Sequence, residues 1–354
     1  MTMATQRLST LFFRHAAPAT LLRIAATSVL SLALTLAGLL AVTFAMSALS
    51  PIDPALQQVG DHASAATYAQ ARHALDLDAP LPERFVHYLD RLCHGDLGVS
   101  TATGQPVLGE LREVFPATFE LSTIALLLSA MAGVGLALLS ARWPGSWIDS
   151  VIRIISLLGS SVPIFWLGLV ALALFYAHWH WAGGPGRLDD AYEYTIDMPT
   201  GLVLVDSWHS GMPGAFPSAV KHMLLPVLLL ASYVLGSIAR LTRTALLGEL
   251  HQEYVTLARA KGAGSSWILL HHVLPNCAGP MLTVIALAYT NLLQGAVLTE
   301  TVFARPGLGR YLTNALFYGD VPAILGATLV LGIAFILING TTDMLVRLLD
   351  PRQR

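Results

Sequence analysis

Long runs without Asp, Glu, Lys or Arg divide the chain. Six such runs occur, at residues 24–52, 121–141, 154–177, 222–239, 277–299 and 321–342. An α-helix that crosses a bilayer needs roughly 17–25 mostly apolar residues, and each run is long enough. Backbone groups in lipid must find hydrogen-bond partners within their own segment, so each run is expected to be helical. The pattern predicts an all-α integral membrane protein with six transmembrane helices.

Composition agrees with this pattern. Hydrophobic residues make up 55% of the 354 residues and charged residues 12%, which is about half the charged share of an ordinary soluble domain. The first apolar run has 29 residues, whereas the apolar part of a cleaved signal peptide has about 7–15. We therefore expect it to be a retained first helix. Gly133 and Gly135 are expected to allow close helix contacts. The net charge of −2 gives no indication of nucleic-acid binding.

The distribution of charge predicts the orientation. Lys and Arg gather on short cytoplasmic loops of membrane proteins. With both termini inside, the cytoplasmic pieces hold 12 of the 20 basic residues, and the external pieces hold 16 of the 22 acidic residues. The expected single-domain layout has a cytoplasmic N-terminus (1–23), helix one (24–49), a periplasmic segment with short helices (50–113), helix two (114–141), a cytoplasmic turn (142–153), helix three (154–177), a periplasmic insert (178–221), helix four (222–239), a cytoplasmic loop (240–276), helix five (277–299), a periplasmic gate loop (300–320), helix six (321–345) and a cytoplasmic C-terminus (346–354).

The loop at 240–276 carries the charge that the apolar runs lack. Its residues up to Lys261 are expected to form a helix with Tyr254, Leu257, Ala258 and Lys261 on one face, because they follow the i, i+3, i+4, i+7 spacing. Gly262 and Gly264 then permit a sharp turn. Ser265 or Ser266 is expected to cap a second short helix that carries Trp267 and Ile268 and ends at Pro275.

Two interpretations of this loop stand beside each other. An amphipathic helix could lie on the bilayer surface, although such helices usually carry more basic residues and a longer apolar face. A helix–glycine–helix elbow is also the shape of a knob that docks into a groove of another protein. The physical pattern favours docking.

The same loop resembles the cytoplasmic EAA loop of ABC importer permeases. Ala258, Gly262, Leu274 and Pro275 fall in register with that motif, whereas Thr256 stands where its Glu is expected. This departure is similar to the subfamily of dipeptide, oligopeptide and nickel permeases. The subfamily pattern is matched by Tyr254-Val255, by Ala258-Arg259-Ala260-Lys261-Gly262 and by His272-Val273-Leu274-Pro275-Asn276.

Further blocks extend the resemblance over nearly the whole chain, in the family's order. They are Gly95-Asp96-Leu97-Gly98, Pro116 to Leu121, Pro163-x-Phe165-Trp166-x-Gly168, Glu300-x-x-Phe303-x-x-Pro306-Gly307-Leu308-Gly309, Asn339-x-x-x-Asp343 and Asp350-Pro351-Arg352. The long segment after helix one resembles the first permease of the family's pair.

The resemblance implies partners and site residues. It implies a second related permease, two cytoplasmic ATP-binding subunits and a periplasmic solute-binding protein, together with the lipid bilayer. The expected ATPase-docking residues are Tyr254, Ala258, Arg259, Lys261, Gly262, His272 and Asn276. The expected periplasmic gate residues are Glu300, Phe303, Pro306, Gly307 and Gly309.

Catalytic machinery is not expected in this chain. A phosphate-binding loop needs Gly-Lys followed by Ser or Thr, but the two lysines, Lys221 and Lys261, precede His222 and Gly262. ATP hydrolysis is therefore expected in another chain, and no cofactor is expected here. A membrane enzyme would need motifs such as His-Glu-x-x-His, which are missing from the sequence. A secondary transporter would need coupling residues at the bilayer centre and mirrored broken helices, and neither is evident.

Polar groups in the spans and external histidines complete the candidate chemistry. Glu120, Asn339 and Asp343 lie in or near apolar runs, where ionisable groups are functional candidates; hydrogen bonding between helices is the alternative for Glu120 and Asp343. The outer histidines, including His178 and His180, have no neighbouring cluster of carboxylates or thiolates, so no metal site is predicted. The transported solute stays open among short peptides, which we favour, nickel, a metal–metallophore complex and glutathione.

Overall fold

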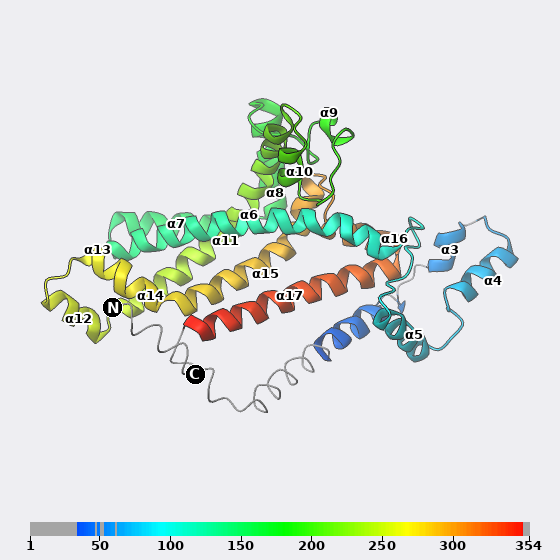
Figure 1. Ribbon diagram of the computed structural model, residues 1–354, viewed down its shortest axis with the longest axis horizontal. Coiled ribbons are helices and arrows are strands. Elements are labelled where there is room, and N and C mark those ends of the chain that lie inside the picture. The colour runs from blue at the N-terminus through cyan, green and yellow to red at the C-terminus, as the bar shows by residue number, and fades with distance from the viewer. Residues whose placement is uncertain (1–33, 47, 50–52, 61, 350–354) are drawn as a thin grey trace.

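The computed structural model describes residues 34–46, 48–49, 53–60 and 62–349. Within these residues the secondary structure is helical, with one isolated bridge between Val99 and Pro106 and no strand. Four helices are long and apolar enough to cross a membrane, and Figure 1 shows them side by side along the long axis of the molecule. They are α6 (Val107–Arg142), α11 (Ala215–Leu250), α15 (Ala278–Val302) and α17 (Val321–Leu349).

Shorter helices lie at both ends of this bundle and on one side of it (Figure 1). The end that we expect to be external holds α3 (Pro54–Val59), α4 (Ala65–Ala74), α5 (Leu81–Cys93) and α16 (Leu308–Tyr318). The opposite end holds α12 (Glu253–Ala260), α13 (Ser265–Ile268), η2 (Leu269–Val273) and α14 (Leu274–Asn276). A lateral lobe contains α8 (Ile164–Ala171), η1 (Leu172–His178), α9 (Asp190–Glu193) and α10 (Val203–His209), and α7 (Trp147–Ser161) leads into it along α6 and α11.

The third predicted span is not one continuous helix. It is divided into α7 and α8–η1, and the break lies at Val162, whose backbone is extended (φ −91°, ψ 133°). The physical reason is Pro163, which lacks an N–H and pushes the preceding residue out of the helical region. Ile164–His178 is one of two shorter apolar helices; the other, Leu34–Met46, is the described part of the first predicted helix. Residues 24–33 of that prediction lie outside the described residues.

Two of the long helices extend well beyond their predicted spans. The α6 helix has 36 residues, or about 54 Å at 1.5 Å per residue, whereas a hydrocarbon core is about 30 Å thick. Apart from Arg142 at its last position, its charged residues lie at and before Glu120, so this first part extends past the apolar zone. The α11 helix continues from span four to Leu250 without a break. The predicted helix up to Lys261 is therefore wrong, because a turn at His251–Gln252 separates α11 from α12.

Close backbone contacts occur where glycines face a neighbouring helix. A Cβ on Gly133 would lie 2.8 Å from Ile238 Cγ2, which confirms the predicted close helix contact at Gly133 and shows that its partner is α11. A Cβ on Gly236 would overlap the backbone oxygen of Ser156, so α7 and α11 touch through their main chains. The prediction for Gly135 is wrong, since nothing lies within 4 Å of its Cβ position.

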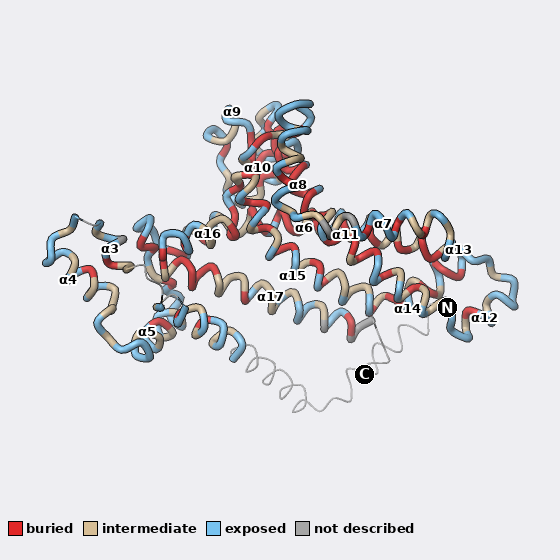
Figure 2. The backbone as a smooth tube through the Cα atoms, turned by 180° about the vertical axis from the view of Figure 1, so that it is seen from behind, coloured by how far each residue is buried: buried red, intermediate tan, exposed pale blue. Residues whose placement is uncertain are grey.

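Burial follows this packing. Figure 2 shows buried residues concentrated in the bundle and at the base of the lobe, while α4 and α12 are largely exposed. The largest buried cluster joins α6, α11 and α15 with the lobe and includes Leu121, Leu230, Leu292 and Val203. The lobe is therefore fixed to the bundle by a shared apolar core.

Candidate docking loop and outer gate

The α12 helix is anchored by one buried side chain. Val255 is completely buried, and it packs in a cluster with Leu246 of α11 and with Ile268 and Val273 of the following helices. Leu257 on the opposite side is 57% exposed. The loop is thus a folded knob that rests on the bundle and presents its outer surface to solvent or a partner.

The predicted docking residues divide into two groups. Arg259, Lys261, Gly262 and Asn276 are exposed, whereas Tyr254, Ala258 and His272 are half-buried. Tyr254 and Ala258 pack against the cluster around Val255. The Tyr254 hydroxyl donates to Glu249 Oε2 over 2.7 Å. Burial raises the pKa of Tyr254, whereas a hydrogen bond with the Asn276 side chain opposes this rise. Tyr254 therefore holds the two ends of the loop together.

Gly262 forms the turn that the sequence predicts. Its φ is +86°, its N–H donates to the Arg259 carbonyl over 2.9 Å, and the Ala263 N–H donates to the Ala258 carbonyl over 3.1 Å. These two bonds form a Schellman motif, in which glycine at the left-handed position avoids a Cβ clash. The predicted serine cap is wrong: Gly264 is the N-cap residue of α13, and no side chain caps this helix. The helical stretch from α13 through α14 ends at Asn276, one residue beyond the predicted end at Pro275.

A second contact ties the loop to the turn between α6 and α7. The Arg142 Nε donates to Ser266 Oγ over 3.0 Å, and the Trp267 ring stacks on His271 with centroids 5.0 Å apart. A pocket of about 330 Å³ lies at this junction, and Arg142, His251 and Arg259 are among its lining residues. The elbow is consequently held in a fixed position relative to α6.

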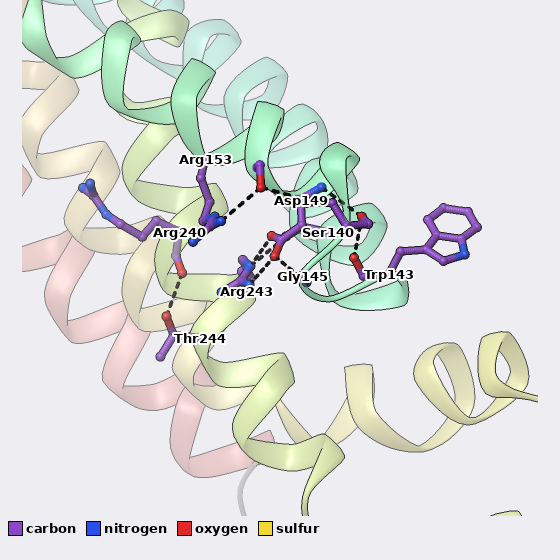
Figure 3. Close-up of polar contacts among 10 residues, drawn as sticks. Ser140, Trp143, Gly145, Asp149, Arg153, Arg240, Arg243 and Thr244 are labelled. Atoms are coloured by element: carbon purple, nitrogen blue, oxygen red, sulfur yellow. Dashed lines mark hydrogen bonds and ion pairs between the residues drawn. The ribbon is translucent and has the colours of Figure 1, made fainter.

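Behind the loop lies a charged network that the sequence reasoning missed (Figure 3). Asp149, which is 1% exposed at the start of α7, accepts from Arg243 of α11 at Nε (2.8 Å) and Nη2 (2.7 Å). Its carboxylate also accepts from the Gly145 N–H over 3.0 Å and from the Ser140 hydroxyl. Hydrogen bonding from Arg243 holds the pKa of Asp149 well below its usual range. The only available sequence signal is Ser146-x-x-Asp149, a capping pattern, and it names no partner on α11.

Residues of the predicted periplasmic gate, Glu300 to Gly309, lie around the N-terminus of α16, and Glu300 caps that helix. The Glu300 carboxylate accepts from the Thr118 hydroxyl over 2.5 Å and from the Arg310 N–H over 3.0 Å. Thr118 Oγ1 in turn accepts from the Leu308 N–H over 2.7 Å. Two of the free N–H groups at the start of α16 are thereby satisfied by side chains from α6 and α15, an arrangement that also favours the negative charge.

The remaining gate residues make this cap possible. Gly307 is the N-cap residue of α16, and a Cβ there would overlap the Glu300 carboxyl group. A Cβ on Gly309 would lie 2.5 Å from Val297 Cα. Phe303 is 1% exposed, and Pro306 is exposed. The two glycines therefore allow close approach, and Phe303 serves as an apolar anchor.

The polar residues of the spans differ in their surroundings. Glu120, 7% exposed, accepts from the Val203 and Leu204 N–H groups over 2.9 Å each and so caps α10. The interhelical alternative thus describes the contacts of Glu120. Asn339 is exposed on α17, and the Asp343 side chain lies outside the described residues. Among the described residues, no group of three or more His, Cys, Asp and Glu side chains is placed to hold a metal ion.

Comparison with known proteins identifies the family. Residues 133–354 match the family described as the binding-protein-dependent transport system inner membrane component, and residues 21–122 match the N-terminal part of such membrane components. The chain belongs to this family. The candidate docking loop and the candidate outer gate both lie in the larger matched region, and the several apolar helices make the permease a multi-pass inner-membrane protein.

Curated relatives cover nearly the whole permease. It is 44% identical over 324 residues to the probable D,D-dipeptide transport system permease protein DdpB of Escherichia coli, covering 91% of this chain and 94% of that protein. It is 39% identical over 321 residues to the di/tripeptide transport system permease protein DppB of Pseudomonas aeruginosa, covering 90% and 95%. An inward-facing form of the MetNI methionine ABC transporter superposes with a TM-score of 0.46 at 15% identity, covering 66% of this chain and 93% of that chain. The family assignment rests on the sequence similarity.

Proposed function

We propose that this chain is the permease subunit of an ATP-driven importer and forms half of the translocation pathway for short peptides. The relatives named above are transport permeases for dipeptides and tripeptides. A second related permease, two ATP-binding subunits and a periplasmic binding protein complete the machine. The chain has no Gly-Lys-Ser or Gly-Lys-Thr sequence, so the partner subunits hydrolyse ATP.

The docking loop carries this proposal. Its exposed side chains Arg259 and Lys261 come directly before the left-handed turn at Gly262, at the end of α12, where acidic groups of an ATPase groove can reach them. Val255 and Tyr254 attach the loop to α11 and α14. Because α11 continues as one helix from Ala215 to Leu250, a push on the loop moves a membrane-spanning helix as a rigid body. Both termini are cytoplasmic in this arrangement.

Charge reversal in the loop tests the docking assignment. In Arg259→Glu the permease inserts normally, but the ATP-binding subunits no longer co-purify and peptide uptake falls to background. Arg153→Glu is the matched control, since Arg153 is also an exposed arginine of the predicted cytoplasmic side, on α7 instead of the loop. Equal co-purification with both variants would refute docking through this loop.

The substrate is tested through the binding protein. Titration of the cognate periplasmic protein with di- and tripeptides, and separately with nickel in the presence and absence of a chelator, is expected to give tight binding of peptides alone. Binding of nickel or its chelate alone would move the substrate to the metal class and leave the permease assignment in place.

A further inference from the structure

Arg305 is the least satisfied polar side chain in the described part of the permease. It is 1% exposed, and its Nε, Nη1 and Nη2 atoms have no hydrogen-bond partner. Burial and the nearby Arg187 lower its pKa to about 10, so the guanidinium still carries its charge at neutral pH. A buried charge without a partner is strongly unfavourable. This arrangement therefore disfavours the conformation in which it occurs.

The neighbouring carboxylates are already engaged elsewhere. Glu300 accepts from Thr118 and from the start of α16, and Glu120 accepts from the start of α10. Arg187, 6% exposed, lies 3.9 Å from Glu120 Oε2 and donates to the Gly201 carbonyl over 2.5 Å. Arg305 is thus excluded from nearby acceptors by contacts that depend on where α10 and α16 lie.

The backbone keeps Arg305 on the same unit as Glu300. The Arg305 N–H donates to the Glu300 carbonyl over 2.9 Å, and the Ala304 N–H donates to the Thr301 carbonyl over 3.3 Å. This is a Schellman ending of α15 with Ala304 at the left-handed position (φ +49°), which is unfavourable for a residue with a Cβ. When α16 moves, Arg305 and Glu300 stay together at the end of α15.

We propose that Arg305 is a gating residue of the permease. It competes with the N-terminus of α16 for the Glu300 carboxylate, so that the carboxylate binds one or the other. In the state seen in the structure, here called the docked state of α16, Glu300 binds the α16 N-terminus and Arg305 is unpaired. In an undocked state, α16 and Thr118 leave Glu300, and Arg305 donates to the carboxylate in their place. Each state leaves one group poorly satisfied, so the two states lie close in free energy and the outer gate can switch between them.

A distance measurement tests the exchange in the assembled importer. Spin labels at Phe119→Cys on α6 and Phe317→Cys on α16, both exposed positions, report the separation of these helices after replacement of Cys93 and Cys277. The exchange predicts two distance populations. Arg305→Met is expected to deplete the longer population at least five-fold, because the undocked state loses its ion pair. Arg305→Lys is expected to retain part of it.

Thr118→Ala serves as the opposing variant. It removes a contact present only in the docked state, so it is expected to enrich the longer population, and its combination with Arg305→Met is expected to restore an intermediate distribution. The exchange also predicts that Arg305→Met raises the melting temperature while peptide uptake falls. Identical distance distributions for the parent and Arg305→Met, or a lower melting temperature in that variant, would overturn the proposal.

The uptake readout rests on the proposed transport function, whereas the distance and melting measurements do not. A single distance population in the parent complex would reject the proposed gate and leave the transport assignment standing. Absence of peptide uptake with the predicted distance shifts present would reject the substrate and leave the gate standing.

Discussion

The pair formed by Asp149 and Arg243 offers the sharpest test of how the docking loop is supported. The two side chains join α7 to α11 just behind α12, through two hydrogen bonds of 2.8 and 2.7 Å. We consider Asp149→Asn, Arg243→Met and the double variant. Each single substitution leaves one partner without its counter-charge, and water barely reaches this partner when it is Asp149.

The expected magnitude follows from burial. Asp149 is 1% exposed and the Arg243 side chain 21%. Breaking a buried ion pair by removing one partner costs about 3–5 kcal/mol. We expect the upper half of this range for Arg243→Met, because this variant leaves the more buried charge, that of Asp149, without a partner. Asp149→Asn is expected to cost about 3 kcal/mol, because the Arg243 guanidinium can still reach solvent. The double variant removes both charges, so its cost falls short of the sum by about 2 kcal/mol.

The pH dependence has a defined sign. The folded-state pKa of Asp149 is depressed by Arg243, so the pair contributes stability above the ordinary aspartate pKa of about 3.9 and loses it as pH falls through the lower folded value. The difference in unfolding free energy between the parent and Asp149→Asn is therefore expected to be constant between about pH 5 and 8 and to shrink below about pH 4.

Unfolding in mixed detergent micelles, followed by circular dichroism and tryptophan fluorescence, measures these differences. Strictly additive costs in the double variant would refute the reasoning, because two groups that do not interact add independently. A difference between the parent and Asp149→Asn that changes across neutral pH would also contradict it.

Two glycine substitutions with matched controls follow from the geometry. Gly236→Ala places a Cβ against the Ser156 backbone and is expected to lower the melting temperature measurably, whereas Gly135→Ala, with nothing within 4 Å, is expected to be neutral or stabilising. Gly262→Ala forces a left-handed backbone at φ +86° and is expected to cost about 1 kcal/mol and to reduce ATPase co-purification, whereas Gly264→Ala at φ −68°, an N-cap position, is expected to cost less and to leave co-purification unchanged. Indistinguishable behaviour within either pair would contradict the corresponding contact.

Some features could be predicted from sequence because local physics determines them. Apolar runs located the four long helices, since lipid requires both apolar side chains and internal backbone bonding. The turn at Gly262 followed from its place after a helical pattern and before another. Glu300, Gly307 and Gly309 were instead selected as one outer motif through the family resemblance, and the structure brings them together at the start of α16.

Other features depend on contacts between distant segments. The pairing of Asp149 with Arg243 joins residues 94 positions apart, and that of Glu120 with Val203 joins residues 83 apart; no local pattern specifies such partners. Local competition explains the break at Val162, where the effect of Pro163 on the backbone outweighs a hydrophobic run that reads as one span. The isolation of Arg305 could not be predicted either, because it depends on which acceptors are already taken.

The central claim is that this permease moves peptides only when separate subunits hydrolyse ATP. The most direct measurement is uptake of a labelled dipeptide into proteoliposomes that contain the permease, its partner permease and the ATP-binding subunits, with the binding protein added outside and ATP enclosed. The account predicts uptake that requires ATP hydrolysis and is lost when this chain is omitted or carries Arg259→Glu. Uptake that proceeds without ATP and follows an imposed ion gradient would contradict it.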